Sequence, residues 1–320
     1  MKKFNRLYGR KVLSMDIGSF ETKIVEGRYT KRGIVVYDYF TVPTPENSYM
    51  DGEILDRELI YYTLRQELKN RNIKTKNVYF TINSSSIITR EIIIPKVDRK
   101  EIEGLLKFQI KEYIPTDSEN YIVQFKIIDT IYEEDIEKLN ILLIAIPKNI
   151  IEEHFQLIKD LDLHPKVLDY QPNSVAKIIN YNFFINEIYP IENVTFAAID
   201  LGYSSTKITI IKNDGIMVSR IVAMGTKDVK ENILVKQSIQ KLNDKIDMVF
   251  RYYLSREIDN TIDMILLYGG GSAINGISST FSDHFNIPSI LIKSLNNIKF
   301  DGEFNKYINS LGAIIRTTEV

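Results

Sequence analysis

The sequence DIGSFETKI at residues 16–24 returns as DLGYSSTKI at residues 200–208, and five of the nine positions are identical at one constant offset. In both copies an apolar, strand-like segment precedes the Asp-x-Gly turn, and two further strand-like segments follow it. A glycine turn joins these last two segments, Lys31-Arg32-Gly33 in the first copy and the hairpin signal Asn213-Asp214-Gly215 in the second. The sequence therefore predicts two halves that each begin with a three-stranded antiparallel meander.

The segments after each meander alternate between helical and strand patterns, which is typical of an α/β fold. Helical periodicity predicts helices at residues 56–69, 98–113, 149–161, 172–180, about 238–255 and around 306–316. Strands are predicted at residues 77–82, 87–94, 121–129, 140–146, 166–169 and 263–268. An acidic turn at residues 133–137 is expected to separate the strands 121–129 and 140–146.

Composition excludes several classes of function. The 320 residues carry 41 basic and 42 acidic side chains, so there is no overall reason to expect binding to nucleic acid or to an acidic lipid surface. The chain has no cysteine and only three scattered histidines, which excludes thiolate metal sites and disfavours histidine ones. Neither a signal-peptide core nor an apolar run of about 18 residues is present, and we therefore expect a cytoplasmic protein.

An Asp-x-Gly turn between two strands suits phosphate binding. Glycine at the tightest point lets successive backbone N–H groups face one concavity, and such nests bind phosphate oxygens. Two such turns facing each other would hold a polyphosphate, with Asp16 and Asp200 orienting a hydrated Mg²⁺. The phosphate contacts expected from the two turns come from Gly18, Ser19, Lys23, Gly202, Ser204, Ser205 and Thr206. A third turn would let a nucleoside lie against bare backbone: Gly269, Gly270, Gly271 and Ser272.

The order of these three motifs resembles that of the actin, heat-shock chaperone and sugar-kinase ATPase superfamily. Within it the chain is most similar to the PilM family of type IV pilus assembly proteins, which are relatives of the cell-division protein FtsA. The most specific segments are TREIIIP at residues 89–95 and EYIP at residues 112–115, because sugar kinases and chaperones lack them. Three further segments add to the resemblance: LHPKVLD at 163–169, RYY at 251–253 and SLGA at 310–313.

The resemblance implies an α/β, actin-like ATPase fold of two RNase H-like lobes, with a small α/β subdomain inserted in the first lobe and a shortened insertion in the second. The implied parts are 1–83 with 163–191 (first lobe core, 1A), 84–162 (inserted subdomain, 1C), 192–223 with 262–320 (second lobe core, 2A) and 224–261 (reduced subdomain, 2B).

The same resemblance implies ATP with Mg²⁺ between the lobes, and a groove beside the inserted subdomain for the N-terminal cytoplasmic peptide of a PilN-like inner-membrane protein. Arg90 and Tyr113 are the residues expected at that groove. The protein would then lie at the inner face of the cell membrane through its partner, without inserting into it. Self-association and contacts with other pilus platform and motor components stay open.

Two departures from the family pattern bear on ATP binding and hydrolysis. Gln171 stands where PilM and FtsA proteins usually carry the Glu that orients the attacking water, and a glutamine cannot accept the proton of that water. Hydrolysis is therefore expected to be slow, with Asp169 either substituting as the catalytic group or holding the turn. Between Gly225 and Ser238 the chain is also too short for the subdomain that usually supplies a Glu and a Lys to adenosine.

Three functions from different classes stay open. In the first, the protein is a scaffold in which ATP closes the lobes and changes the affinity for the membrane partner. In the second, it is a pure adaptor with a degenerate nucleotide site, which fits the shortened second lobe. The third, a small-molecule kinase on the same fold, would need a carboxylate base facing a substrate and leaves the segments at 89–95 and 112–115 unexplained.

Overall fold

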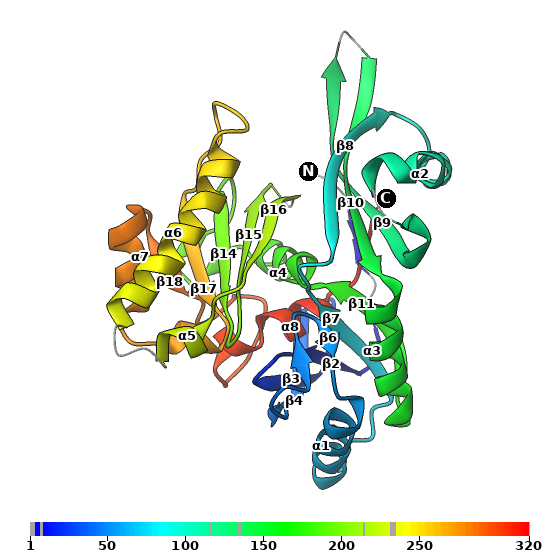
Figure 1. The fold of residues 1–320 in the computed structure, drawn as a ribbon, viewed down its shortest axis with the longest axis vertical. Helices are drawn as coiled ribbons and strands as arrows, with labels where there is room; N and C mark the ends of the chain where they lie inside the picture. Colours follow the sequence, from blue (N-terminus) through cyan, green and yellow to red (C-terminus); the bar gives the residue numbers. More distant parts are fainter. Residues whose placement is uncertain are drawn as a thin grey trace. The chain divides into compact units, whose positions relative to one another are not determined.

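The repeated sequence forms the centre of two sheets that share one strand order (Figure 1). The structure is a computed structural model that describes residues 4–6, 9–114, 117–133, 136–213, 215–230 and 235–319. The chain separates into two compact units, one made of Met1–Asn83 with Phe155–Val320 and the other of Ser84–His154. Both repeated sheets belong to the first unit.

The first sheet is built around the first copy of the repeat. β2 (Val12–Ile17), β3 (Glu21–Thr30) and β4 (Gly33–Pro43) form the expected antiparallel meander. β7 (Asn77–Ile82) pairs in parallel with β2, and β11 (His164–Tyr170) pairs in parallel with β7, so the order is β11-β7-β2-β3-β4. Every residue of β2 is buried, as expected for a central strand that is covered on both faces.

The second sheet repeats this arrangement with the second copy. Its meander consists of β14 (Phe196–Leu201), β15 (Thr206–Lys212) and β16 (Gly215–Val222). The parallel strands β17 (Met264–Tyr268) and β18 (Ser289–Leu291) extend it to the order β16-β15-β14-β17-β18. The predicted duplication, with one meander opening each half, is therefore confirmed.

Two helices cross between the sheets of the first unit. α8 (Ile308–Ile314) packs on β2, β3 and β7, while α4 (Gln171–Asn180) packs on β7, β11 and also on β16 (Figure 1). The two helices pack on each other where Gly312 meets Ser174, and a Cβ atom on Gly312 would lie 2.1 Å from the Ser174 carbonyl oxygen. Glycine is required there because only a bare backbone allows so close an approach.

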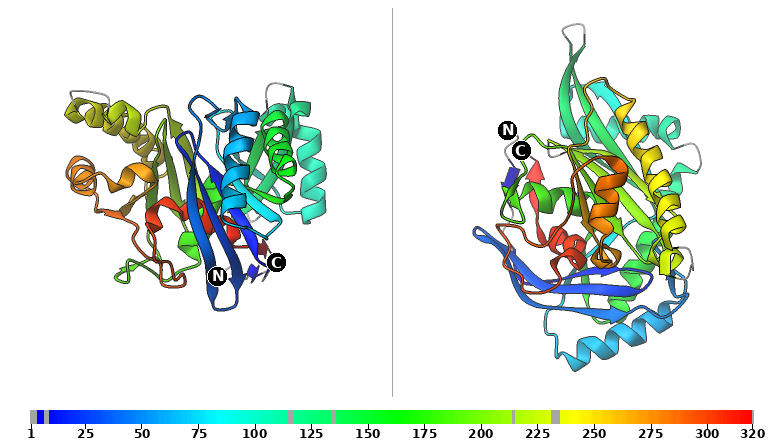
Figure 2. Two further views of the ribbon diagram at one scale, coloured as in Figure 1. Left: turned by 90° about the horizontal axis from the view of Figure 1, so that it is seen from below. Right: turned by 90° about the vertical axis from the view of Figure 1, so that its left-hand side faces the viewer.

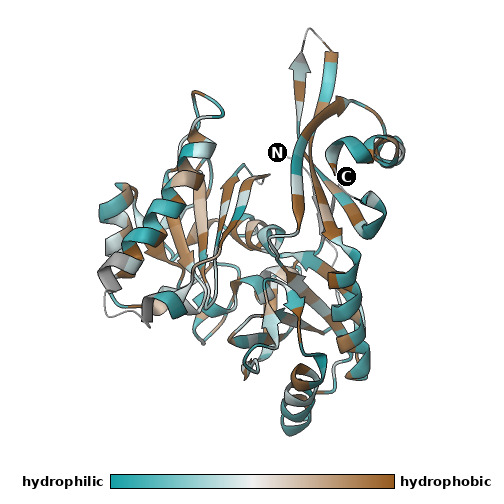
Figure 3. Ribbon diagram, viewed as in Figure 1, coloured by the Kyte–Doolittle hydropathy of each residue, from teal (hydrophilic) through white to brown (hydrophobic). Residues whose placement is uncertain are grey.

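The outer face of the second sheet is covered by α6 (Val235–Leu254) and α7 (Ile277–Phe285). Ile246 and Phe250 of α6 and Phe281 of α7 are buried in one cluster with alternate residues of the strands. Figure 3 shows β14 and β17 mainly in the hydrophobic colour. The amphipathic helices thus bury the apolar face that the sheet presents to them.

A buried ion pair fixes the start of α4 at the end of β11. The carboxylate of Asp169 accepts hydrogen bonds from Asn173 Nδ2 and Ser174 Oγ, both at 2.9 Å, and it pairs with the Lys177 ammonium. Burial alone would raise the pKa of the Asp169 carboxyl, but Lys177 and the hydrogen bonds hold it below its usual value. Lys177 Nζ also donates to the Ile315 carbonyl at 2.8 Å, which ties α4 to the residue after α8.

The second unit is a three-stranded antiparallel sheet with one helix on it. β10 (Ile136–Pro147) lies between β8 (Ile88–Pro95) and β9 (Tyr121–Glu133). α2 (Arg99–Tyr113) covers one face, where its apolar residues pack on those of β10. The apolar core of this unit is formed by Ile94, Ile102, Leu106, Ile114, Leu139, Ile141, Leu143 and Ala145.

The remaining elements are short or connect the two units. α1 (Arg57–Asn70) packs on β4, and α3 (Lys148–Asp160) runs from the second unit into the first. The short strand pairs are β1 (Phe4–Arg6) with β19 (Thr317–Glu319), β5 (Tyr49–Met50) with β6 (Glu53–Ile54), and β12 (Phe184–Ile185) with β13 (Tyr189–Pro190). The short helices are α5 (Thr226–Lys230) and the 3₁₀ turns Ser118–Asn120, Gly270–Ala273 and Phe304–Lys306. Because β1 pairs with β19, the first and last described segments of the chain lie side by side (Figure 2).

Several expected boundaries were wrong. β9 extends to Glu133 and β10 begins at Ile136, so most of the expected acidic turn is strand; residues 134 and 135, like Asp214 of the second meander turn, lie outside the described residues. The helix expected around 306–316 is confined to Ile308–Ile314, and α6 begins at Val235 rather than near 238. At the end of the β9–β10 hairpin, Tyr132 and Ile136 are both exposed although they lie on opposite faces, so the alternation of buried and exposed residues that marks a strand is absent there.

The structure separates into two compact units, and the finer division into 1A, 1C, 2A and 2B stays a prediction. Among the described residues, no helix has both the length and the apolar character needed to cross a membrane.

We predict that the α4–α8 contact at Gly312 is a main support of the first unit. Gly312→Ala should destabilise the protein by at least about 2 kcal/mol, because the added methyl group meets backbone rather than a movable side chain. Gly104→Ala is the matched control: Gly104 also lies inside a helix, but a Cβ there meets nothing within 4 Å. It should stabilise α2 by up to about 1 kcal/mol. Urea unfolding followed by circular dichroism measures both, and equal stability of the two variants would contradict the prediction.

Candidate functional site

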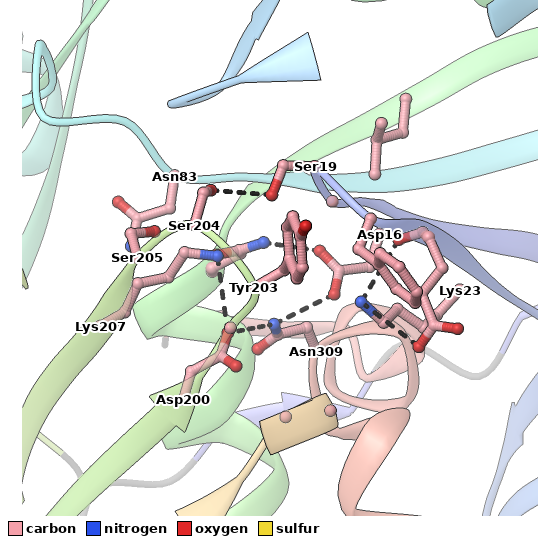
Figure 4. Close-up of a pocket in the computed structure, with 18 of the residues that line it drawn as sticks. Asp16, Ser19, Lys23, Asn83, Asp200, Tyr203, Ser204, Ser205, Lys207 and Asn309 are labelled. Carbon is pink, nitrogen blue, oxygen red and sulfur yellow. Dashed lines mark hydrogen bonds and ion pairs between the residues drawn. The ribbon is translucent and has the colours of Figure 1, made fainter. Parts of the chain in front are cut away.

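The two Asp-x-Gly turns meet at a cavity of about 260 Å³ in the first unit (Figure 4). Both turns follow the central strand of their sheet, β2 in one and β14 in the other. The residues expected from the sequence that line the cavity are Asp16, Gly18, Ser19, Lys23, Gln171, Asp200, Gly202, Ser204, Ser205, Gly269, Gly270 and Gly271. The fold therefore brings together most of the nucleotide-binding residues expected from two distant parts of the chain.

Each copy of the repeat places an aspartate opposite a lysine. Asp16 faces Lys23 across β2 and β3, and Asp200 faces Lys207 across β14 and β15. Lys207 Nζ lies 3.5 Å from Asp200 Oδ2, whereas Lys23 Nζ donates to the Glu21 carbonyl at 3.3 Å. Lys23 was expected as a phosphate contact and Lys207 was not, although the two occupy equivalent positions of the repeat.

Asp16 is a buried acidic group of the cavity that accepts three side-chain hydrogen bonds. Only 5% of it is exposed, and its Oδ1 accepts from Thr81 Oγ1 at 2.9 Å and from Gln171 Nε2 at 2.5 Å. Its Oδ2 accepts from Asn309 Nδ2 at 3.1 Å. Three neutral donors thus offset the cost of burying this carboxylate.

Asn309 connects the two carboxylates. Its Nδ2 also lies within 3.5 Å of Asp200 Oδ2, so one amide group stands between Asp16 and Asp200 (Figure 4). It was missed in the sequence, although an Asn-Ser pair inside an otherwise apolar helix is a signal. A buried amide in such a helix needs polar partners, and these have to come from another part of the fold.

Three amide atoms at the cavity have no hydrogen-bond partner. They are Gln171 Oε1, Asn309 Oδ1 and Asn83 Nδ2, from side chains that are each at most 6% exposed. Buried polar groups are nearly always hydrogen-bonded, so two acceptors and one donor in this position are suited to a polar ligand. Asn83 follows β7 and was missed, although the ends of parallel strands are the usual place of ligand contacts in α/β sheets.

The glycines of the three turns lie close to other backbone. A Cβ atom would lie 2.9 Å from the Glu21 carbonyl oxygen at Gly18 and 2.7 Å from the Ser205 carbonyl oxygen at Gly202. Gly269 has a φ of +84°, and a Cβ there would lie 2.1 Å from Asp200 Oδ1. The third turn therefore lies directly against the carboxylate of the second.

Two further elements add side chains that the sequence analysis did not include. The β5–β6 hairpin contributes Tyr49 and Asp51, and the 3₁₀ turn before α8 contributes Lys306. Burial raises the pKa of Tyr49 and of Tyr268, and the nearby carboxylates raise both further, so these two hydroxyls stay uncharged at neutral pH.

Some expected site residues lie elsewhere in the first unit. Thr206 is buried and donates to the Met224 carbonyl at 2.9 Å, while Ser272 donates to the Gly269 carbonyl at 2.6 Å and accepts from Asn305. Neither lines the cavity, and neither does Asp169, whose oxygens are engaged by the start of α4. Of the shortened segment, Thr226 lines the cavity.

The two expected groove residues lie in the second unit. Arg90 is exposed on β8, and its position pairs with Leu143 on the face that α2 covers. Tyr113 packs against the apolar core of this unit and donates to Gln109 Oε1 at 3.1 Å. Both residues thus lie on one face of the sheet.

A divalent cation at the cavity would have to be held largely through water. In the described part of the chain, no group of three or more His, Cys, Asp or Glu side chains is placed to hold a metal ion. Asp16 and Asp200 with the free amide oxygens of Gln171 and Asn309 nevertheless form a set of oxygen acceptors, which suits the water shell of Mg²⁺.

Comparison with known proteins identifies the fold and the family. A chain of the PilM-PilN type IV pilus biogenesis complex is similar with a TM-score of 0.80 and 17% identity, over 95% of this chain and 97% of that one. The ethanolamine utilization protein EutJ from Carboxydothermus hydrogenoformans is similar with a TM-score of 0.54 and 13% identity, over 97% and 91%. MreB 5 of Spiroplasma citri bound to AMPPNP is similar with a TM-score of 0.50 and 13% identity, over 95% and 94%.

These likenesses confirm the expected actin-like ATPase fold with its mixed α/β sheets. The model of one family, described as type IV pilus assembly protein PilM, matches residues 14–241. The chain thus belongs to the PilM family of type IV pilus assembly proteins.

Proposed function

We propose that this chain is a nucleotide-responsive scaffold of type IV pilus assembly. ATP with Mg²⁺ binds in the cavity of the first unit, and the second unit binds the N-terminal cytoplasmic peptide of a PilN-like inner-membrane protein. Closure of the two lobes around the nucleotide changes the affinity for that peptide. The observation that carries the proposal is the duplicated Asp–Lys pair, Asp16 with Lys23 and Asp200 with Lys207, around one cavity.

The phosphates are bound by the two turns. Backbone N–H groups next to Gly18 and Gly202 and the hydroxyls of the turn serines provide donors without charge. Lys23 and Lys207 add one positive charge from each copy of the repeat. The arrangement is suited to a chain of phosphates, because its donors come from both sides of the cavity.

The cavity favours the magnesium complex over free ATP. Four carboxylates line it, and only three ammonium groups oppose them: Asp16, Glu21, Asp51 and Asp200 against Lys23, Lys207 and Lys306. A free triphosphate would enter a site that already carries a negative charge, which is unfavourable at short range. A divalent cation removes this repulsion, and Asp16 and Asp200 would orient its water shell.

The nucleoside lies against the third turn. Gly269 and Gly271 approach the backbone of β14, whereas a Cβ on Gly270 would meet only Glu21 Oε1, at 4.0 Å. Gly270 therefore presents open backbone to the cavity, and Lys306, which also lines the cavity, offers a further polar contact. Of the described part of the shortened segment after Gly225, Thr226 lines the cavity, so these contacts replace the Glu and Lys that the family pattern usually supplies there.

Hydrolysis is slow in this proposal, because Gln171 is already engaged. Its Nε2 donates to Asp16, and its remaining oxygen can orient a water but cannot take the proton of that water. ATP then acts mainly as a ligand that selects the closed arrangement of the lobes.

The peptide of the membrane partner adds to the edge of the second unit. β8 pairs with β10 on one side only among the described strands, so its other edge offers backbone hydrogen-bonding groups to an extended peptide. Arg90 and Ile93 alternate between the two faces along this edge, and Ile93 is 55% exposed. The relative with a TM-score of 0.80, which comes from a PilM-PilN complex, supports a PilN-like partner. Through that partner the protein lies at the inner face of the cell membrane.

Nucleotide binding is tested with matched lysine variants. Lys23→Met and Lys207→Met should each weaken the binding of Mg-ATP by about tenfold or more, because each removes a charge-assisted contact to phosphate. Lys212→Met is the control, since Lys212 also lies on β15 but does not line the cavity. Isothermal titration calorimetry gives the affinities, and EDTA should abolish binding. No binding by the unmodified protein at millimolar Mg-ATP would leave the pure adaptor as the function.

Partner binding is tested on the β8 edge. Ile93→Asp and Arg90→Glu should each weaken the binding of a synthetic PilN N-terminal cytoplasmic peptide by at least tenfold, as measured by fluorescence anisotropy. Ile136→Asp serves as control, because Ile136 is 58% exposed in the same sheet but lies at the start of β10. If all three variants bind the peptide equally well, the peptide does not use this edge.

A further inference from the structure

The two phosphate turns are joined to each other by two contacts. Ser19 Oγ and Ser204 Oγ share a hydrogen bond of 2.7 Å, which Figure 4 shows as a dashed line. The rings of Phe20 and Tyr203 lie with their centroids 4.9 Å apart and their planes inclined by 33°. All four residues line the cavity. We name these two contacts together the clasp.

The clasp follows the symmetry of the repeat. At the offset that aligns Asp16 with Asp200, Ser19 aligns with Tyr203 and Phe20 aligns with Ser204. Ser19, at the first position of its turn, bonds to Ser204, at the second position of the other turn. Phe20, at the second position, packs on Tyr203, at the first. Such crossed pairing is expected of two equivalent turns that face each other across an approximate two-fold axis.

The turns that carry the clasp are fixed at their backbones. The Phe20 carbonyl accepts from the Thr44 N–H at 3.0 Å, and the Tyr203 carbonyl accepts from the Lys227 N–H at 3.0 Å. Gly225 lies so close behind the second turn that a Cβ on it would be 2.2 Å from the Tyr203 oxygen. Neither turn can swing away alone without losing these contacts. Opening of the clasp therefore separates the two halves of the first unit.

The clasp also occupies groups that a phosphate would use. While Ser19 and Ser204 bond to each other, the hydroxyl proton of one of them is engaged between the turns rather than available to a phosphate. The ring pair stays partly open to solvent, with Phe20 60% and Tyr203 36% exposed. Both contacts are individually modest, so a ligand that offers stronger hydrogen bonds can replace them.

We propose that the clasp is a gate of the nucleotide site, which opens while the phosphates enter and lets the two halves close again around the bound nucleotide. This inference rests on the proposed nucleotide binding. On entry, the hydrogen bond between the two serines is exchanged for bonds from each serine to phosphate, and the two rings part. The two turns thus separate only while the phosphates enter, and the closed arrangement of the lobes then holds the bound nucleotide.

The chain allows a direct test, because it contains no cysteine. In the double variant Ser19→Cys with Ser204→Cys, oxidation can form only one disulfide within a chain, the one that locks the clasp, and the disulfide-linked dimer is removed by gel filtration. The oxidised protein should bind Mg-AMPPNP at least tenfold more weakly than the same protein after reduction, as measured by isothermal titration calorimetry. Equal affinity in the two redox states, with the disulfide verified by mass spectrometry, would overturn the gate.

A second variant tests the ring pair without altering a phosphate contact. Phe20→Ala should speed the association of a fluorescent methylanthraniloyl-ATP at least threefold in stopped flow, since the gate then opens more readily. Phe183→Ala is the matched control, because Phe183 is 69% exposed and does not line the cavity. Unchanged association in Phe20→Ala would count against the gate. If neither the unmodified protein nor the reduced double variant binds nucleotide, the proposed nucleotide binding is overturned. If the oxidised and reduced double variants bind nucleotide equally well, only the gate is overturned.

Discussion

The hydrogen bonds of Asn309 to Asp16 and Asp200 are the contacts on which the arrangement of the first unit depends most. Two carboxylates, each at the end of a central strand, are buried beside each other, and a single neutral amide serves both. The helix that carries Asn309 is buried at every position and packs closely on α4 at Gly312. The position of the two turns around the cavity therefore follows from how α8 is held.

The duplication was predictable because the sequence signals for each meander lie within short stretches of the chain. Strand period, the Asp-x-Gly turn and the hairpin glycines act over a few residues, so both meanders and their register with the turns were expected correctly. Boundaries depend on tertiary contacts, and they were less well predicted. The β9–β10 hairpin runs on past the region that α2 covers, where exposure of both faces removes the apolar alternation.

Of the residues that line the cavity, mainly those that belong to the two Asp-x-Gly turns and the third, glycine-rich turn were predicted. Asp16, Asp200 and the glycines of the turns were expected because the turn chemistry itself points to phosphate. Asn309, Asn83 and Tyr49 come from segments far apart in the chain, and only the packing of the sheets and of α8 brings them to the cavity. Thr206 illustrates the reverse case, since its place in the repeat suggested a phosphate contact while its hydroxyl bonds to backbone.

In our proposal the two compact units carry different binding sites. The first unit carries the cavity lined by carboxylates and lysines, and the second carries a sheet in which β8 has no partner on one side among the described strands. In our proposal these two sites are coupled, since a ligand that binds one arrangement of the lobes more tightly shifts the protein toward it. A cavity lined by unpaired amide atoms and an excess of carboxylates is suited to such a regulatory ligand.

The most direct test of this account measures the coupling itself. The affinity of the PilN N-terminal peptide is determined by titration calorimetry with the full chain, once without nucleotide and once with saturating Mg-AMPPNP. The account predicts that the two dissociation constants differ by at least about fivefold, and that the peptide changes the affinity for Mg-AMPPNP by the same factor. Identical peptide affinities in the presence of bound nucleotide would contradict it.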